Sequence, residues 1–102
     1  MDKRTALKLT RQYIKLVKEK YDVKKAYLFG SFAWGDAHKD SDIDVAVVLG
    51  QKFDFHKTQL DLMRMTWDLE TSIEPHPIHV KDFNRDFSVA AEILIYGIPI
   101  KV

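Results

Sequence analysis

Cysteine is absent from the 102-residue chain, and glycine (4) and proline (3) are scarce. Without cysteine the chain has no disulfides, cysteine-based zinc sites, iron–sulfur ligands or thiol nucleophiles. The low glycine and proline content excludes collagen-like and low-complexity chains. No apolar run approaches the roughly 20 residues that span a bilayer, and the first residues show no signal-peptide core. We therefore expect a cytoplasmic protein that does not contact membranes.

Charge is unevenly distributed along the chain, although the net formal charge is only +1. Residues 1–25 carry nine lysines and arginines and three acidic residues, whereas the remainder carries seven and twelve. A basic segment can contact nucleic acid or an acidic partner, but lysines also solvate the outer face of an amphipathic helix. We favour solvation and expect no direct binding to nucleic acid.

Hydrophobic periodicity predicts helices and strands in alternation. Helices are expected over residues 4–21, 31–34, 57–70 and 86–96, and strands over residues 25–29, 43–49, 72–80 and 98–102. This order is typical of an α/β fold built around one small sheet. The length, with 46% hydrophobic and 30% charged residues, predicts a single domain over residues 1–102.

Several expected elements carry informative side chains. The continuous apolar run over residues 45–49 predicts a strand that is covered on both faces. Pro75 and Pro77 lack an N–H, so their strand should lie at a sheet edge or be irregular. Met63, Met65 and Trp67 are interpreted as the core face of the third helix.

Asp42 and Asp44 stand two residues apart at the start of the apolar strand. Residues at this spacing project from the same face of a strand, roughly 7 Å apart along the chain. Two carboxylates on one face repel each other, and a divalent cation between them relieves the repulsion. Oxygen ligands of this kind favour Mg²⁺ or Mn²⁺ over zinc. The alternative interpretation is that the two acids only solubilise the entry to the strand.

Gly30 and Ser31 follow a strand directly and precede the expected short helix. A glycine permits close approach of a ligand to the backbone, and a hydroxyl with the N–H groups of a helix start can bind phosphate. An ordinary strand-to-helix turn would explain the pair equally well in isolation. A phosphate-binding turn about ten residues before a metal-binding carboxylate pair is, however, the combination that a nucleotidyl transferase needs.

The two motifs together carry a family resemblance. The pattern G-S-x-A-x-G over residues 30–35, followed by S-D-I-D over residues 41–44, resembles the signature of the polymerase-β-like nucleotidyltransferase superfamily. The short chain is similar to the minimal nucleotidyltransferases of bacteria and archaea. The resemblance implies a small mixed sheet with flanking helices. It also implies Mg²⁺-dependent transfer of a nucleoside monophosphate, usually AMP from ATP, to a hydroxyl.

The resemblance also implies roles for particular residues. Gly30 and Ser31 would hold the triphosphate, and Asp42 and Asp44 would hold Mg²⁺ or Mn²⁺. The family places a third carboxylate on a neighbouring strand, where it completes the metal site and can act as general base. Glu74 is the only acid in the third expected strand, and we assign it this role.

Two histidines of the same strand offer an alternative to Glu74. If His76 or His79 occupied the third carboxylate position, metal-assisted catalysis would be weakened or lost. Trp34, inside the motif, either packs against the first helix or forms an aromatic wall or interface anchor.

The resemblance finally implies a partner, because minimal nucleotidyltransferases are often paired with a HEPN-domain protein in toxin–antitoxin modules. The first hypothesis is an antitoxin enzyme that transfers AMP to its partner. The second is a non-catalytic antitoxin that neutralises the partner by contact alone. The third is an antibiotic-modifying transferase, which would need a homo-oligomer to complete a small-molecule pocket.

Overall fold

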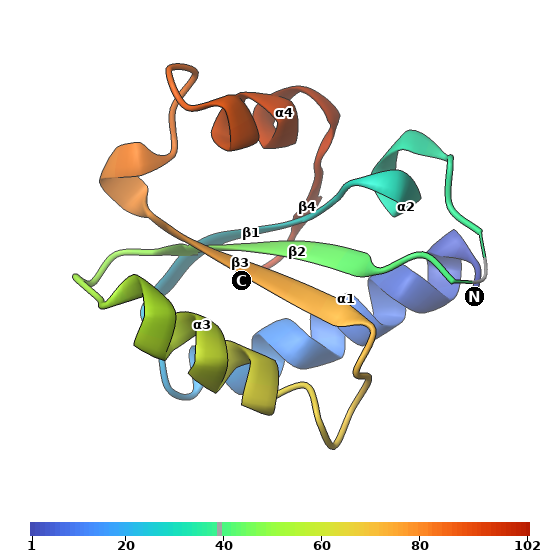
Figure 1. Cartoon of the computed structure of the whole chain (residues 1–102), viewed down its shortest axis with the longest axis horizontal. Helices are drawn as coiled ribbons and strands as arrows, with labels where there is room; N and C mark the ends of the chain where they lie inside the picture. Colours follow the sequence, from blue (N-terminus) through green and yellow to red (C-terminus); the bar gives the residue numbers. More distant parts are fainter. Residues whose placement is uncertain (39) are drawn as a thin grey trace.

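The computed structural model describes residues 1–38 and 40–102 and forms a four-stranded mixed sheet with helices on both faces (Figure 1). Its elements in chain order are α1 (Lys3–Lys18), β1 (Val23–Phe29), α2 (Ser31–Trp34), β2 (Ile43–Leu49), α3 (Phe55–Arg64), β3 (Ile73–His79), the 3₁₀ helix η1 (Val80–Asp82), α4 (Ser88–Tyr96) and β4 (Ile98–Ile100). The fold class expected from the sequence is confirmed. Among the described helices, none has the length and apolar character needed to cross a membrane.

The sheet has the strand order β3-β2-β1-β4. Strand β1 pairs antiparallel with β2 and with β4, whereas β2 and β3 run parallel. Every residue of β2 is buried except Asp44, which is half-buried. The expectation that this apolar run is covered on both faces is therefore confirmed, and Asp44 interrupts it at a single position.

The two faces of the sheet are covered by different helices. Helices α1 and α3 lie on one side, and α4 with η1 lies on the other (Figure 1). Val45 and Val47 of β2 belong to the larger core, which includes residues of α1 and α3. Ala46 packs instead with Ile93 of α4. Because strand side chains alternate between faces, Asp44 shares the α4 side with Ala46.

Strand β3 lies at an edge of the sheet, as its two prolines predicted. Pro75 and Pro77 are buried. Glu74, which precedes Pro75, and His76, which lies between the two prolines, are more exposed. The carbonyl of Pro75 accepts a hydrogen bond of 2.8 Å from Gln59 Nε2 of α3. The prolines thus face α3, and their missing N–H groups cost the sheet little at an edge. This alternation directs Glu74 and His76 to the opposite face.

The interpretation of residues 57–70 as one helix with a methionine–tryptophan core was wrong in part. Helix α3 ends at Arg64, and turns follow it. Trp67 is 68% exposed and Met63 is also exposed, whereas Met65 packs at the margin of the core. The register of the helix explains the error, because Leu62 is fully buried and its neighbour Met63 therefore faces outward.

The ring of Trp34 has its aromatic neighbour in α4. It lies 5.6 Å from the ring of Tyr96 in α4, in an edge-to-face arrangement. Half of the Trp34 surface stays exposed. The α2 helix is therefore tied to α4 on the side of the sheet that carries Asp44.

Polar contacts link α1 and the turn after it to α3. The buried hydroxyl of Tyr13 donates to the carbonyl of Leu62 at 2.7 Å. Asp61 accepts from the Lys20 ammonium at 2.7 Å and from the Tyr21 hydroxyl. The Lys20 hydrogen bond, followed by that of Tyr21, lowers the pKa of Asp61, and burial together with Asp61 raises the pKa of Tyr21 to about 12.

Replacing Tyr13 with phenylalanine should destabilise the fold by about 1–3 kcal/mol, because the buried Leu62 carbonyl would lose a partner that water cannot replace. Urea unfolding should show a lower midpoint with an unchanged slope. The exposed Tyr96 provides a matched control, and Tyr96→Phe should stay within about 0.5 kcal/mol of the parent. Equal effects of the two changes would contradict this role for the Tyr13 hydroxyl.

Candidate active site

The connection from β1 into α2 brings backbone against a carboxylate. Gly30 adopts a φ of +74°, a conformation that disfavours side chains, and it forms the N-cap of α2. A Cβ atom at this position would press directly on an oxygen of the Asp44 carboxylate. Glycine is therefore required here for two reasons, its backbone conformation and the close approach of Asp44. The motif residues Gly30 and Asp44 meet in space although thirteen residues separate them in the sequence.

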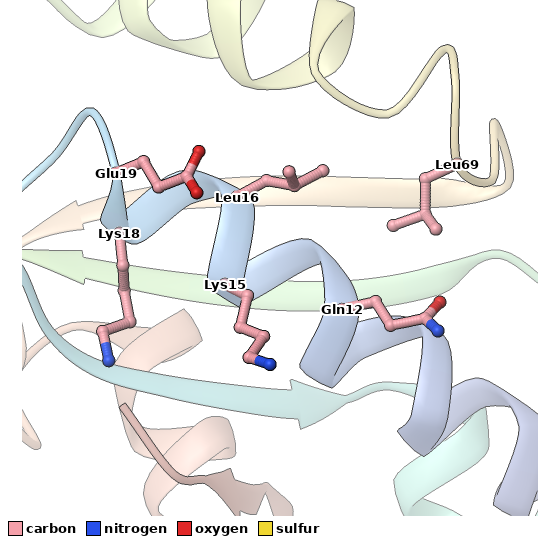
Figure 2. A pocket seen from close by; sticks show the side chains of 6 residues that line it. All are labelled: Gln12, Lys15, Leu16, Lys18, Glu19 and Leu69. Carbon is pink, nitrogen blue, oxygen red and sulfur yellow. The ribbon is translucent and has the colours of Figure 1, made fainter.

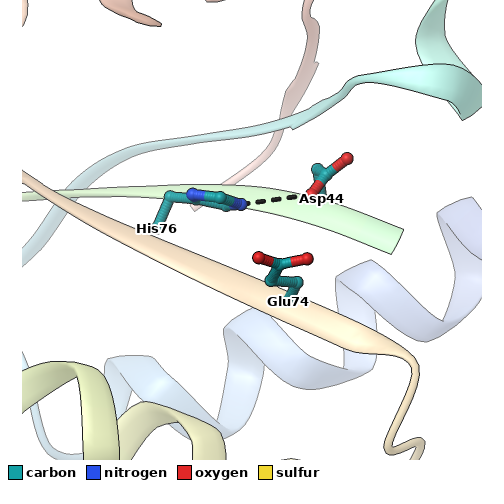
Figure 3. Close-up of side chains that lie close together, drawn as sticks. All are labelled: Asp44, Glu74 and His76. Atoms are coloured by element: carbon teal, nitrogen blue, oxygen red, sulfur yellow. Dashed lines mark hydrogen bonds and ion pairs between the residues drawn. The ribbon is translucent and has the colours of Figure 1, made fainter. Parts of the chain in front are cut away.

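Asp44 meets two side chains from the neighbouring strand. In the parallel ladder of β2 and β3, Asp44 is paired with Glu74, and Ala46 is paired with His76. One potential ligand atom from each of Asp44, Glu74 and His76 lies within 4.8 Å of the other two (Figure 3). His76 Nε2 lies 3.1 Å from Asp44 Oδ1, within hydrogen-bond distance. The register of two parallel strands thus assembles a compact group of two carboxylates and one imidazole.

The ring of His76 is held by its surroundings. The Phe29 ring packs edge-on against it with 4.9 Å between centroids. The side chains of His76 and Asp44 are 32% and 24% exposed, so both reach solvent while resting on the sheet. A cation or phosphate could therefore approach the group from the α4 side.

Asp42 lies in the segment just before β2 and is exposed. It is outside the compact group of Asp44, Glu74 and His76. Asp42 and Glu74 nevertheless line the same hollow of about 240 Å³, together with Gln59 and Met63 of α3 and the segment 71–73. Both acids therefore border one open space beside the N-terminal ends of β2 and β3.

His79 lies away from this group. It ends β3, its Nδ1 accepts a hydrogen bond from the Lys81 backbone N–H, and its ring faces Phe53. Two histidines could have occupied the third carboxylate position. Among the described residues, the structure places His76, and not His79, beside Asp44. His76 accompanies Glu74 instead of replacing it, which the sequence did not lead us to expect.

The donor set fits a divalent cation. Two carboxylates supply hard oxygen ligands and His76 supplies one nitrogen, all converging from rigid strands. Asp44 is close to the Gly30 backbone, so a ligand held by Asp44 would also lie near the turn that begins α2. Ser31 is the first residue of α2. Because the N-cap residue, Gly30, has no side chain, no side-chain hydrogen bond caps the start of this helix. The arrangement can bring a cation and a phosphate chain together.

A larger hollow lies elsewhere on the surface. It encloses about 640 Å³ along α1, with Leu69 from the turns after α3 at its margin (Figure 2). Lys15 and Lys18 project from α1 on one side, and Leu16 lies on the other (Figure 2). Helix α1 covers the face of the sheet opposite Asp44, so this hollow is separate from the compact group of carboxylates and imidazole.

Comparison with known proteins identifies the family. Residues 11–101 match the family model described as polymerase beta, nucleotidyltransferase. The chain belongs to this family. Its match runs from α1 to the end of β4 and includes Gly30, Ser31, Asp42, Asp44 and Glu74.

Curated relatives come from Methanocaldococcus jannaschii. The chain is 41% identical over 51 residues to MJ0435, which is named a candidate protein adenylyltransferase, and the match covers 50% of each chain. It is 40% identical over 50 residues to MJ0604, which carries the same kind of name, covering 47% of this chain and 50% of the relative. The chain spans about half the length of the curated relatives it matches.

Solved structures share the fold. A candidate nucleotidyltransferase from Sulfolobus solfataricus matches with a TM-score of 0.65 and 21% identity, covering 78% of this chain and 71% of that one. A chain of a toxin–antitoxin complex with AMP-PNP matches with a TM-score of 0.66 and 22% identity, covering 88% and 70%. The toxin–antitoxin MntA-HepT matches with a TM-score of 0.60 and 18% identity, covering 89% and 68%. These likenesses show the nucleotidyltransferase fold.

Proposed function

We propose that the protein is a metal-dependent nucleotidyltransferase that moves AMP from ATP to a hydroxyl group of a partner protein. The observation that carries the proposal is the meeting of the Gly30 turn with Asp44 beside Glu74. Family membership and the names of the curated relatives support AMP transfer to protein. Residues 1–102 would form one catalytic domain, and ATP as donor would place the reaction in the cytoplasm.

Each proposed site residue has a distinct task. The Gly30 backbone and the Ser31 hydroxyl would bind the triphosphate, and Asp42, Asp44 and Glu74 would hold Mg²⁺ or Mn²⁺. A divalent cation bound there would neutralise the negative charge that the phosphates bring to the two strands. Asp42 would have to turn toward Asp44, which its position before the strand permits. The strands fix the other two carboxylates in place.

The reaction we propose is an in-line displacement at the α-phosphorus of ATP. The acceptor hydroxyl oxygen forms a bond to that phosphorus, and the bond from phosphorus to the bridging oxygen of the β-phosphate breaks. Pyrophosphate leaves with the bonding electrons. The hydroxyl proton passes to the Glu74 carboxylate, which borders the open hollow where the acceptor would enter.

A macromolecular acceptor suits the surface around the site better than a small molecule. The hollow beside Asp42 and Glu74 measures about 240 Å³, below the roughly 300–1,000 Å³ of most small-ligand pockets. Exposed apolar side chains lie on the side of the sheet that carries Asp44, including Ile95 (71% exposed) and Tyr96 of α4 and Trp34 of α2. We propose a HEPN-domain protein as this acceptor, in line with the toxin–antitoxin complexes among the structural neighbours.

A second candidate function is neutralisation of the partner by contact alone. The contact between His76 and Asp44 favours it, because an imidazole that occupies a carboxylate oxygen competes with a cation for that oxygen. The exposed residues of α4 and α2 would then bind the partner without chemistry. The two functions differ in whether AMP becomes attached to the partner.

Glu74 provides the first test of the catalytic proposal. Glu74→Gln should lower AMP transfer about 10²-fold or more, the scale of a lost general base. Binding of ATP should largely survive, since Gly30 and Asp44 stay in place. The measurement pairs calorimetric titration of a non-hydrolysable ATP analogue with transfer of label from [α-³²P]ATP to the partner.

A matched control is Glu70→Gln, because Glu70 precedes the same strand and bonds to Ser72 outside the compact group. This variant should transfer AMP at close to the parent rate. Transfer by Glu74→Gln at the parent rate would remove Glu74 from the mechanism.

A further inference from the structure

The compact group contains a nitrogen donor in addition to its carboxylates. We propose that His76 Nε2 is itself a ligand of the bound cation, and that this ligand makes the site prefer Mn²⁺ to Mg²⁺. The inference rests on the proposed function for the presence of a cation and deepens it by assigning a ligand and a metal preference. His76 then acts in the same group as Asp44 and Glu74 (Figure 3).

The geometry of the group suits one six-coordinate ion. Neighbouring ligands of an octahedral ion with bonds of about 2.1 Å lie about 3 Å apart, and opposite ligands lie about 4.2 Å apart. His76 Nε2 lies 3.1 Å from Asp44 Oδ1, the separation of two neighbouring ligands. All three donor atoms lie within 4.8 Å of one another, so small side-chain rotations would place Glu74 in the same coordination sphere.

The position of the imidazole is fixed before any ion binds. His76 lies between two buried prolines, Pro75 and Pro77, which face α3. Because side chains alternate along a strand, His76 lies on the opposite face, with Asp44. The Phe29 ring packs against the imidazole at 4.9 Å and restricts its rotation. A ligand held in this way loses little side-chain entropy when it binds an ion.

Ligand chemistry decides the metal preference. Mg²⁺ favours oxygen ligands and gives up its water reluctantly, so an imidazole in its coordination sphere is a poor ligand. Mn²⁺ accepts carboxylate oxygen as readily as Mg²⁺ does. As a softer transition-metal ion, it binds imidazole nitrogen better than Mg²⁺ does. The imidazole therefore makes the group bind Mn²⁺ more tightly than Mg²⁺, and the two carboxylates still supply the oxygen ligands that both ions accept. In the neutral imidazole that binds the ion, the proton sits on Nδ1 and leaves the Nε2 lone pair free.

The direct test is electron spin echo spectroscopy of the whole protein loaded with Mn²⁺ and inorganic triphosphate. Triphosphate contains no nitrogen, so a coupled nitrogen must come from the protein. We expect modulation from a directly bound imidazole nitrogen, and its pattern should change when the histidines are labelled with ¹⁵N. Bound Mn²⁺ without imidazole coupling, or failure to bind Mn²⁺ at all, would overturn the inference.

Calorimetric titration with each metal alone gives a second, independent readout. In His76→Asp the group contains oxygen donors only, and the ratio of the Mg²⁺ to the Mn²⁺ dissociation constant should fall about tenfold or more. His56→Gln is the matched control, because His56 is exposed at the start of α3, and it should leave the ratio unchanged. An unchanged ratio in folded His76→Asp would overturn the inference.

These outcomes separate the inference from the proposed function. If AMP transfer occurs and Mn²⁺ is bound through oxygen atoms alone, the assignment of His76 as a ligand is wrong and the transferase proposal stands. If imidazole coupling appears and no AMP transfer is found with any hydroxyl acceptor, the ligand assignment stands and the transferase proposal is wrong.

Discussion

Replacing Asp44 with asparagine should reduce AMP transfer by at least about 10³-fold, the largest effect we expect from a single change. The carboxylate lies at the junction of the Gly30 turn, Glu74 and His76. In the proposed mechanism its charge would therefore serve the metal and the triphosphate at once. Loss of one electrostatic group in an active site costs about 10²–10³-fold, and Asp44 has more than one such contact. Single-turnover transfer of label from [α-³²P]ATP measures the effect.

Asp44→Asn should keep its fold, because the amide is nearly the same size and Asp44 is only half-buried. Circular dichroism and the thermal midpoint should stay close to those of the parent. Asp68→Asn, a change of an exposed acid in the turns after α3, should transfer AMP normally. Asp44→Asn with transfer within about threefold of the parent would exclude the proposed site.

Replacing Gly30 with alanine should have the second largest effect, on stability and on nucleotide binding together. A residue other than glycine at φ +74° costs about 1–3 kcal/mol, and the new Cβ would displace the Asp44 carboxylate. Binding of a non-hydrolysable ATP analogue should fall at least about tenfold, measured by calorimetry on protein that urea unfolding shows to be folded.

Gly35 provides the control that separates the two causes. It has a φ of +81°, but a Cβ there would meet no atom within 4 Å. Gly35→Ala should therefore lower stability through backbone strain alone, by about 1–2 kcal/mol, and leave nucleotide affinity within about threefold of the parent. Equal losses of affinity in both variants would show that backbone strain, and not the displacement of Asp44, governs nucleotide binding.

The fold was predictable from the sequence where periodicity or turn residues were strong. The apolar run of residues 45–49 predicted a strand covered on both faces, and Pro75 and Pro77 predicted an edge or irregular strand, of which the edge position is the one observed. The extent and inner face of α3 were not predictable in the same way. Leu60 and Leu62 are both apolar, and packing against the sheet alone decides that Leu62 is buried and Leu60 exposed.

The pairing of strands explains which parts of the site could be predicted. Gly30 and Asp44 belong to one local motif, and the family resemblance already implied that they act together; the structure brings them into contact. The contribution of β3 depends on a register between strands that are far apart in the sequence, with Asp44 opposite Glu74. A shift of one residue would have turned both Glu74 and His76 to the other face.

The joint presence of Glu74 and His76 beside Asp44 has a signal in the sequence. The two residues are spaced by two and are separated by Pro75, so both must project from the same face of β3. Treating them as alternatives assumed that the strand offers a single third position. Alternation in a strand allows two neighbouring side chains to reach one carboxylate.

The central claim is that the protein attaches AMP to a hydroxyl of a HEPN-domain partner, and one measurement tests it most directly. The protein is incubated with [α-³²P]ATP, Mg²⁺ or Mn²⁺ and the HEPN-domain product of a neighbouring gene, and the partner is analysed by intact-mass spectrometry. We predict that the partner gains label and the mass of one AMP, that pyrophosphate is released in equal amount, and that Asp44→Asn forms neither product. An unmodified partner that is neutralised equally well by the parent and by Asp44→Asn would contradict the claim and establish neutralisation by contact.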